Sequence, residues 1–464
     1  MSEVTAGRDG TGGTAEMRVR YAVLVPLLMA VFLSVLDYAV ANIALPTISG
    51  VLHITAAQSV WVVNAYQLAN AMLLLPLAAW ADRIGSARLC QIGLVIIMAG
   101  SGMCAVASSF PVLVFARVVQ GIGGACVMSV SAALVRVCYP HSRLGEALAL
   151  NALVTALGFA CSPAVAAGIL SIASWRWLFL FNIPYGLITL GLTVVSFPRV
   201  PVRHTAFDAS AAILNMLAFG GILVAGDWLA HGSERALGWG MLVVGLVSLA
   251  LLAKRQHGQA APLFPVDLFM IGPLRVAAAV CFMGYVASNF FMISIPFTLT
   301  SLFHKTQVTT GLMITLWPLG MMVAGPLVGR LADRVHPGLL AAVGLFVVGT
   351  GYMLLRVCPA DASTANIIWR FGFAGMGFAF FVAPNNKAIM QAAPLERSRG
   401  ASAIISLARI LGQSTGATLV AFVMTRGGSH ASLHCLELGA FTAWGAAGLS
   451  ASRLLRRAGP EGKR

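Results

Sequence analysis

The chain has 464 residues, of which 59% are hydrophobic and only 10% charged, and it carries a formal net charge of +15. Soluble globular domains carry about 25% charged residues, so this composition excludes a soluble globule and predicts a polytopic membrane protein. The basic residues lie at the ends of apolar segments rather than in one patch, which argues against nucleic-acid binding. The eight cysteines occur singly, with no C-x-x-C pair and no Cys/His cluster, so neither a disulfide framework nor a metal site is predicted.

Residues 1–17 are rich in Gly, Thr and acids and lack an apolar core, which predicts a disordered tail rather than a signal peptide. Fourteen apolar runs follow, each long enough to cross a bilayer. Most of the 30 Lys and Arg fall in the tails and the even-numbered connections, which predicts cytoplasmic termini. The predicted spans are 21–46, 58–80, 89–108, 111–136, 146–170, 177–197, 209–230, 236–253, 274–302, 308–329, 338–357, 364–384, 400–424 and 434–452.

An internal repeat divides the chain. The sequence Trp80–Arg83 after the second span recurs in similar form as Leu331–Arg334 after the tenth. Each copy precedes an arginine inside a later span, Arg117 for the first and Arg370 for the second. Parallel repeats of this kind place a substrate site between two halves near the midplane of the membrane. The predicted organisation is a tail (1–17), a six-helix half (18–200), two inserted helices (201–256), a cytoplasmic linker (257–273), a second six-helix half (274–456) and a tail (457–464).

The first span carries one acid, Asp37, with Asn42 five residues later. A charged side chain at the centre of a membrane helix costs about 2.5–3.5 kcal/mol even on insertion scales, so it usually faces the protein interior and has a function. We expect Asp37 to carry a proton; the alternative is a polar group that only fixes helix packing. The repeat places Asn289 at the position of Asp37 in the second half, which confines the titratable group to the first half.

The fourth span carries Arg117, followed by Gly121, Gly123 and Gly124. A guanidinium cannot lose its proton at ordinary pH, so Arg117 needs an anion or several carbonyl acceptors. Asp37 is the only deeply placed acid in this half, and we therefore predict that the two side chains pair. A purely structural Arg117 is the alternative. The glycines allow another helix to approach closely.

Four segments together resemble one family. Leu36–Pro46 is similar to a helix 1 signature, Ala78–Arg88 to a cytoplasmic motif between helices 2 and 3, and Leu113–Ala125 to an intramembrane arginine motif. Gly158–Gly168, followed by Trp175–Gly186, resembles an antiporter motif and the entry to helix 6. The chain thus resembles the fourteen-helix drug:proton antiporter branch of the major facilitator superfamily, the EmrB/QacA type, over nearly its whole length. The resemblance implies an all-α major facilitator fold of two six-helix halves plus two inserted helices.

Further site residues follow from these motifs. The cytoplasmic motif and its second copy are expected to gate a rocking motion, the alternative being ordinary turns with snorkelling bases. In the antiporter-motif helix, small residues are expected to allow close contact and a proline to bend the helix. The gating residues are Asp82, Arg83, Gly85, Arg88, Asp333 and Arg334; the antiporter-motif residues are Gly158, Pro163 and Gly168. The expected substrate cavity is lined by Tyr38, Asn42, Trp61, Asn64, Gln67, Asn151, Asn289, Phe290 and Trp317.

The leading interpretation is a proton-coupled secondary transporter that exports lipophilic, cationic compounds by alternating access. No G-x-x-x-x-G-K-[ST] sequence supports direct ATP drive, no catalytic cluster supports an enzyme, and no cofactor beyond the proton gradient is expected. The alternative cargo is a specific metabolite or an anionic conjugate, which Arg370 and Arg409 favour; Arg409 has no evident acid partner, and backbone carbonyls could also satisfy it. A membrane enzyme or sensor is a third interpretation.

The expected setting is the inner membrane of a bacterium, with the lipid bilayer as surroundings and the chain as a functional monomer. The resemblance also allows a periplasmic adaptor and an outer-membrane channel as partners.

Overall fold

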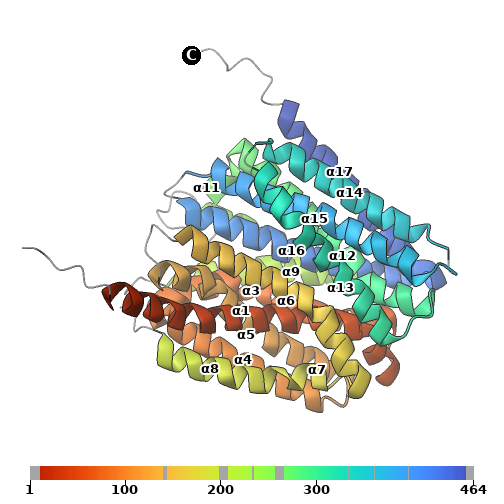
Figure 1. Ribbon diagram of the computed structural model, residues 1–464, viewed down its shortest axis with the longest axis horizontal. Coiled ribbons are helices and arrows are strands. Elements are labelled where there is room, and N and C mark those ends of the chain that lie inside the picture. The colour runs from red at the N-terminus through yellow and green to blue at the C-terminus, as the bar shows by residue number, and fades with distance from the viewer. Residues whose placement is uncertain are drawn as a thin grey trace, which may run out of the picture.

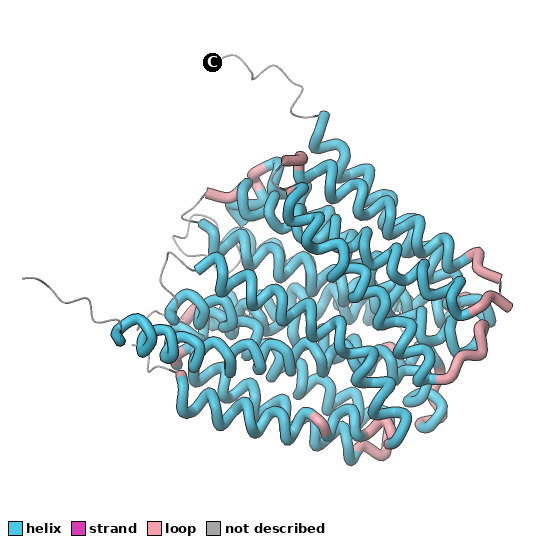
Figure 2. Tube along the Cα trace, in the orientation of Figure 1, coloured by secondary structure: helices cyan, strands magenta, loops and turns pink. Residues whose placement is uncertain are grey.

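The computed structural model describes residues 11–138, 144–197, 207–231, 235–256, 266–332, 334–359, 361–394 and 397–455. These residues form helices joined by short loops, and the described ranges contain no strand (Figure 2). An all-helical chain is expected in a bilayer, because a helix satisfies its own backbone hydrogen bonds where water is absent.

The helices form two bundles (Figure 1) and a helical pair whose first helix contacts both of them. The first bundle comprises α1 (Thr11–Val51), α2 (Ala56–Ser59), α3 (Trp61–Ile84), α4 (Ser86–Val106), α5 (Phe110–Cys138), α6 (Leu144–Ile172), α7 (Trp177–Leu180) and α8 (Asn182–Ser196). The second comprises α11 (Val266–Phe269), α12 (Gly272–Ser301), α13 (Gln307–Leu331), α14 (Pro337–Arg356), α15 (Thr364–Ala392), α16 (Ser398–Arg426), the 3-10 turn η3 (Gly428–His430) and α17 (Ala431–Leu455). The pair is α9 (Ala209–His231) and α10 (Arg235–Gln256).

Each of the fourteen predicted spans falls on a helix, and twelve stretches of the described chain are long and apolar enough to cross a membrane. The polytopic membrane architecture is therefore confirmed. The other two predicted spans lie on α6 and α17, which are not among the twelve. α17 carries the polar side chains His434 and Glu437 near its start. These two spans stay a prediction.

The inserted pair is held together at one end by an exposed ion pair. Arg255 Nε lies 2.9 Å from Asp208 Oδ2, and Arg255 Nη2 donates to Asp208 Oδ1 at 3.1 Å. Together with the backbone amide of Ala211, this contact lowers the pKa of Asp208 to about 2. Along the pair, Gly221 and Gly245 face each other with no room for a side chain, so the two backbones touch directly.

α9 lies between α3 of the first bundle and α16 of the second (Figure 1). Its buried Asn215 donates from Nδ2 to the carbonyl oxygen of Met72 in α3 at 2.9 Å. That carbonyl would normally accept from the amide four residues later, but residue 76 is Pro76, which has no N–H. A side chain of the inserted helix thus satisfies the backbone group that a proline leaves free, which attaches α9 to the first bundle.

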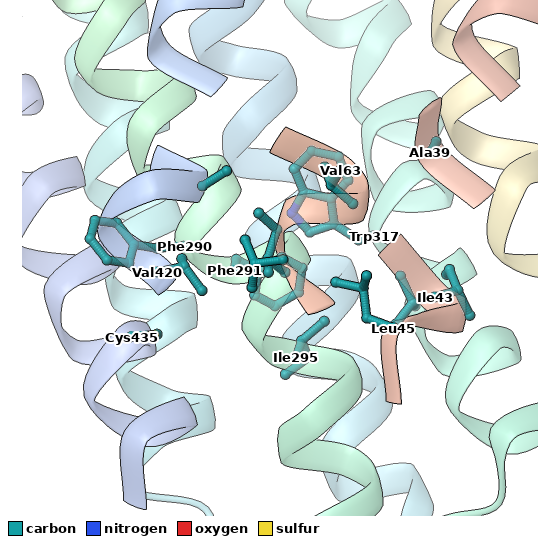
Figure 3. Close-up of a cluster of buried hydrophobic side chains, with 14 of the residues drawn as sticks. Ala39, Ile43, Leu45, Val63, Phe290, Phe291, Ile295, Trp317, Val420 and Cys435 are labelled. Atoms are coloured by element: carbon teal, nitrogen blue, oxygen red, sulfur yellow. The ribbon is translucent and has the colours of Figure 1, made fainter. Parts of the chain in front are cut away.

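The two bundles share one large hydrophobic core, which lies at one level of the membrane. We call the side on which α1 begins the terminal side and the opposite side the far side. One cluster joins residues from the far-side halves of α1 and α3 with residues of α12, α13, α16 and α17. Figure 3 shows part of it, with Ile43, Leu45 and Val63 of the first bundle beside Ile295 and Trp317 of the second.

On the terminal side, by contrast, the larger buried clusters each belong to one bundle. One contains side chains of α1, α4 and α5, and another contains side chains of α11, α12, α15 and α16. Only two small clusters bridge the bundles there, and both include α9, through Leu223 or Phe219. The bundles are therefore packed together on the far side and have separate cores on the terminal side.

Candidate functional site

A buried ion pair lies at the centre of the first bundle. Arg117 Nη1 is 3.0 Å from Asp37 Oδ2, and the side chains are 0% and 1% exposed. This is the contact that the sequence analysis expects, made between α5 and α1. Each charge offsets the cost of burying the other, which neither could sustain alone in a low-dielectric interior.

Two neutral amides complete the environment of the Asp37 carboxylate. Gln120 Nε2 and Asn182 Nδ2 donate to Asp37 Oδ1 at 2.9 and 2.6 Å. Both amides also donate to the hydroxyl of Ser101, at 2.8 and 3.1 Å. Side chains from α1, α4, α5 and the start of α8 thus meet at one carboxylate. Three donors on its two oxygens, one of them cationic, favour its ionised form.

The Arg117 guanidinium is held by more than its anion. Its Nε donates to the carbonyl of Val62 at 2.9 Å, and its Nη1 also donates to Gln120 Oε1 at 2.8 Å. The cation lies over the rings of Tyr66 and Phe179, with its Cζ 4.7 and 5.5 Å from the centroids. Its Nη2 is buried without a hydrogen-bond partner among the described residues. The surroundings therefore keep the charge in place and leave one donor free.

Glycines bring the backbones close enough to build this site. A Cβ at Gly121 would overlap the Tyr66 carbonyl of α3, and a Cβ at Gly123 would lie 2.7 Å from the Gly93 carbonyl of α4. A Cβ at Gly124 would overlap the Tyr66 hydroxyl. The close helix approach expected of these glycines is present, and it fixes the depth at which Arg117 meets Asp37.

A set of polar contacts joins the two bundles beside this site, and we call its four residues, Tyr38, Gln67, Asn289 and Gln413, the clasp. The Tyr38 hydroxyl of α1 donates to Asn289 Oδ1 of α12 at 3.3 Å. Gln67 Nε2 of α3 donates to Gln413 Oε1 of α16 at 2.9 Å. Asn289 Nδ2 in turn donates to the backbone carbonyl of Gln413. Because Tyr38 follows Asp37 on one helix, the contact between the bundles is one residue away from the buried carboxylate.

Other predicted cavity residues lie in several places. Trp61 and Asn64 line a small pocket between α3, α9 and α16, where Asn64 Nδ2 donates to Thr418 Oγ1 at 3.4 Å. Asn42 Nδ2 donates to the carbonyl of Tyr38 on its own helix, and the Oδ1 atoms of Asn42 and Asn151 are buried without a partner among the described residues.

Phe290 and Trp317 belong to the hydrophobic core that joins the two bundles on the far side. Phe290 packs against Gly439 of α17, and Figure 3 shows it on the side of Cys435. The Trp317 ring stacks on Phe291 with centroids 6.2 Å apart. In this conformation Phe290 packs against α17, and Trp317 packs in the core that the two bundles share, so neither position supports the prediction that these residues line a cavity.

The antiporter-motif helix α6 contacts both bundles. Gly158 lies against Val35 of α1, and the Pro163 carbonyl and Ala167 lie against Gly311 of α13. Of the three predicted residues, Gly168 faces open space, with nothing within 4 Å of the position its Cβ would occupy. The close contacts expected of the motif are therefore made at Gly158 and around Pro163 and Ala167, and not at Gly168.

The predicted gating residues lie at the terminal side. Asp82 and Arg83 are exposed at the end of α3, and Gly85 has a φ of +93°, which favours glycine and turns the chain into α4. Arg88 and Arg334 are also exposed, whereas Asp333 lies outside the described residues.

Among the described residues, no group of three His, Cys, Asp or Glu side chains is placed to hold a metal ion. Ser101 was not predicted as a site residue, and Gln120 and Asn182 stood only within quoted motifs. Gln120 had a usable signal, because it lies three residues after Arg117 and hence on the same helix face.

Residues 27–251 and 276–461 match the model of the Major Facilitator Superfamily. The chain belongs to this superfamily. It is 42% identical over 421 residues to the uncharacterized transporter YebQ of Escherichia coli K12, covering 89% of this chain and 92% of that protein. It is therefore a transporter, and its fold is the major facilitator fold that the sequence motifs predict.

More distant members of the superfamily are named for different cargoes. The chain is 26% identical to the riboflavin transporter RibZ of Clostridioides difficile, over 86% of this chain and 87% of RibZ. It is 27% identical to the multidrug resistance protein Stp of Mycobacterium tuberculosis, over 88% of this chain and 76% of Stp. A crystal structure of the peptide transporter POT in complex with sulfate shares the fold, with a TM-score of 0.71, 15% identity and 94% of both chains covered.

Proposed function

We propose that this superfamily member is a proton antiporter that exports lipophilic compounds from the cytoplasm by alternating access. The observation that carries the proposal is the Asp37 carboxylate, an acid buried at membrane depth in contact with Arg117. Such residues mark ion and proton pathways because burying them without a function is costly. The other described acids lie at helix ends or in loops, so Asp37 is the group to which we assign proton loading.

The donors around Asp37 suggest how loading is controlled. With Arg117, Gln120 and Asn182 all donating, the hydrogen bonds stabilise the ionised carboxylate against the cost of its burial. Withdrawal of the guanidinium would leave a buried charge with only amide partners, and the carboxylate would then take up a proton. The proton is thus bound when the pair opens and released when it closes.

The clasp can couple proton binding at Asp37 to the change of conformation between the bundles. Tyr38 and Asp37 are neighbours on α1, so breaking the contact of Tyr38 with Asn289 moves the segment that holds the carboxylate. The shared far-side core and the separate terminal-side cores are the arrangement expected of a state open toward the terminal side. We assign that side to the cytoplasm of a bacterium, with both termini there, on the distribution of Lys and Arg.

The test is substrate-induced proton release from the detergent-solubilised protein, measured with a pH indicator for wild type and for Asp37→Asn across a range of pH. Wild type should release protons when it binds substrate, and Asp37→Asn should release none while still inserting and purifying normally. Arg117→Ala should impair coupling more than substrate binding. Equal proton release from Asp37→Asn and wild type would remove Asp37 from the mechanism and make Asp227 the next residue to test.

The charge of the substrate separates two candidate functions. The sequence comparison with drug:proton antiporters favours lipophilic cations. Arg409, a half-buried cation on α16, favours the export of metabolites or conjugates with an anionic group instead. Efflux from energised vesicles, with and without a proton uncoupler, tests transport and proton coupling for either cargo, because uncoupling should abolish the efflux. The protein is expected to act as a monomer, alone or with a periplasmic adaptor and an outer-membrane channel.

A further inference from the structure

Arg409 is a half-buried side chain whose charge the proposed mechanism leaves unused. Among the described residues, no carboxylate pairs with its guanidinium and no hydrogen bond to it is formed. The side chain is half-buried, and its charge acts on Cys281 and Tyr285 of α12. Arg117, the buried arginine of the first bundle, has an anion, two acceptor oxygens and two aromatic rings around it. The charge of Arg117 is thus satisfied by its surroundings, whereas that of Arg409 has no anion beside it among the described residues.

The contacts of α16 show where Arg409 points. One face of the helix packs on α12, since a Cβ at Gly412 or Gly416 would collide with that helix. The face near Ile410 packs on α3 and α9. Arg409 lies between these faces, on the same stripe as Gln413 one turn further along, because residues four apart in a helix share a face. Gln413 reaches across to the first bundle, so Arg409 points toward the space between the bundles, on the terminal side of the clasp.

Tyr285 occupies the matching position on α12. It lies one turn from Asn289, the clasp residue on that helix, and also toward the terminal side. Its ring packs edge-on against Phe378 and Phe381, with centroids 5.7 and 6.2 Å apart. Tyr285 thus lies on the part of α12 that packs against α16 at Gly412, within electrostatic range of Arg409 and on the terminal side of the clasp, with Phe378 and Phe381 behind its ring.

A guanidinium in this position suits an anion. It keeps its charge at any ordinary pH and offers paired donors that match a carboxylate. The Asp37 charge is already balanced by Arg117, so the field of Arg409 is not cancelled from the first bundle. A lipophilic cation would be repelled, whereas an organic anion would gain a charged hydrogen bond together with aromatic contact.

We propose that Arg409 and Tyr285 form the anion subsite of the substrate cavity, and that this transporter takes lipophilic organic anions such as carboxylates. The proposal rests on the export function proposed above and names its substrate class. It also changes the charge balance of transport. One proton entering and one monoanion leaving move charge in the same direction, so the cycle would respond to membrane potential, whereas exchange of a proton for a monovalent cation would be electroneutral.

Binding tests the subsite without requiring transport. The detergent-solubilised full chain would be titrated with radiolabelled decanoate and with decyltrimethylammonium, two probes with the same chain and opposite charge. Wild type should bind decanoate more tightly. Arg409→Gln should weaken decanoate binding about tenfold or more, as expected for loss of a charged hydrogen bond, without weakening that of the cation. Arg409→Lys should give an intermediate affinity, because it keeps the charge and loses the paired geometry.

The matched control is Arg426→Gln, which removes a cation from the far-side end of the same helix and should leave both affinities unchanged. The proposal is overturned if wild type shows no saturable decanoate binding, if it prefers the cation, or if Arg409→Gln binds decanoate as wild type does. If Arg409→Gln does not purify as a monodisperse protein, Arg409→Lys decides the matter, since unchanged decanoate affinity there would exclude a paired contact.

Transport separates this proposal from the one on which it rests. In proteoliposomes with an imposed pH gradient, a membrane potential should accelerate decanoate export by wild type. Selective decanoate binding that depends on Arg409, without proton-driven export, would contradict the antiporter function and support the subsite. Proton-driven export of decyltrimethylammonium that excludes decanoate would support the antiporter function and contradict the subsite.

Discussion

The buried pair of Asp37 and Arg117 can be tested as a unit by a double-mutant cycle. Asp37→Asn would leave the guanidinium with the Val62 carbonyl and Gln120 as acceptors. Arg117→Met would leave the carboxylate with the amides of Gln120 and Asn182 only. Breaking a buried pair on one side costs about 3–5 kcal/mol, because an uncompensated charge remains. Because these hydrogen-bond partners remain, we expect the loss of unfolding free energy in each single variant to lie near the lower end of that range.

The double variant should lose less free energy of unfolding than the sum of the losses in the two single variants. With both charges gone, no buried ion remains, so we expect a coupling energy of about 2–3 kcal/mol, at the upper end of what contacting residues show. The assay is the free energy of unfolding in mixed micelles, followed by circular dichroism as denaturing detergent is added. Asp267→Asn with Arg397→Met is the matched control, because that pair is 50% and 26% exposed and should show much weaker coupling.

Additive effects at Asp37 and Arg117 would refute the reasoning. They would mean that each charge is stabilised independently by its neutral neighbours, and that opening the pair releases too little energy to control proton binding. A coupling as small as that of the exposed control pair would lead to the same conclusion.

Three further predictions concern topology, gating and the inserted helices. A reporter fused after Arg255 should be cytoplasmic and one fused near Ser233 should be external; reversed signals at both sites would contradict the orientation assigned here. Asp82→Asn should leave expression nearly normal and slow transport, since it removes a conformational bias rather than a binding contact, and unchanged turnover would make the motif an ordinary turn. Asn215→Leu should lower the free energy of unfolding by about 1–3 kcal/mol, because the Met72 carbonyl loses its donor inside the membrane, and an unchanged value in the same micelle assay would show that this carbonyl finds another partner.

The amino-acid sequence by itself determined the membrane class, most of the spans and the pairing of Asp37 with Arg117. The physical reason is that burying a polar or charged group in the hydrocarbon of the bilayer costs much free energy. A span needs a long apolar run that can be read directly, and a charge within such a run stands out and requires a partner. With one deep acid and one deep arginine in the first half, the choice of partner was forced, and the contact of 3.0 Å follows from it.

The tertiary structure alone decided which neutral side chains join that pair and where the bundles touch. An uncharged Asn, Gln or Ser side chain costs little free energy in a membrane helix, so it can occur there without a partner. Nothing in the spacing of Ser101 and Asn182 therefore indicates that they meet beside one carboxylate from α4 and α8. The contact between Gln67 and Gln413 joins residues 346 apart in the chain, and its existence depends on how two whole bundles pack. The same packing places Phe290 in the core that joins the bundles and leaves Arg409 without an anion among the described residues, because the rotation and depth of each helix are set by its neighbours rather than by its own sequence.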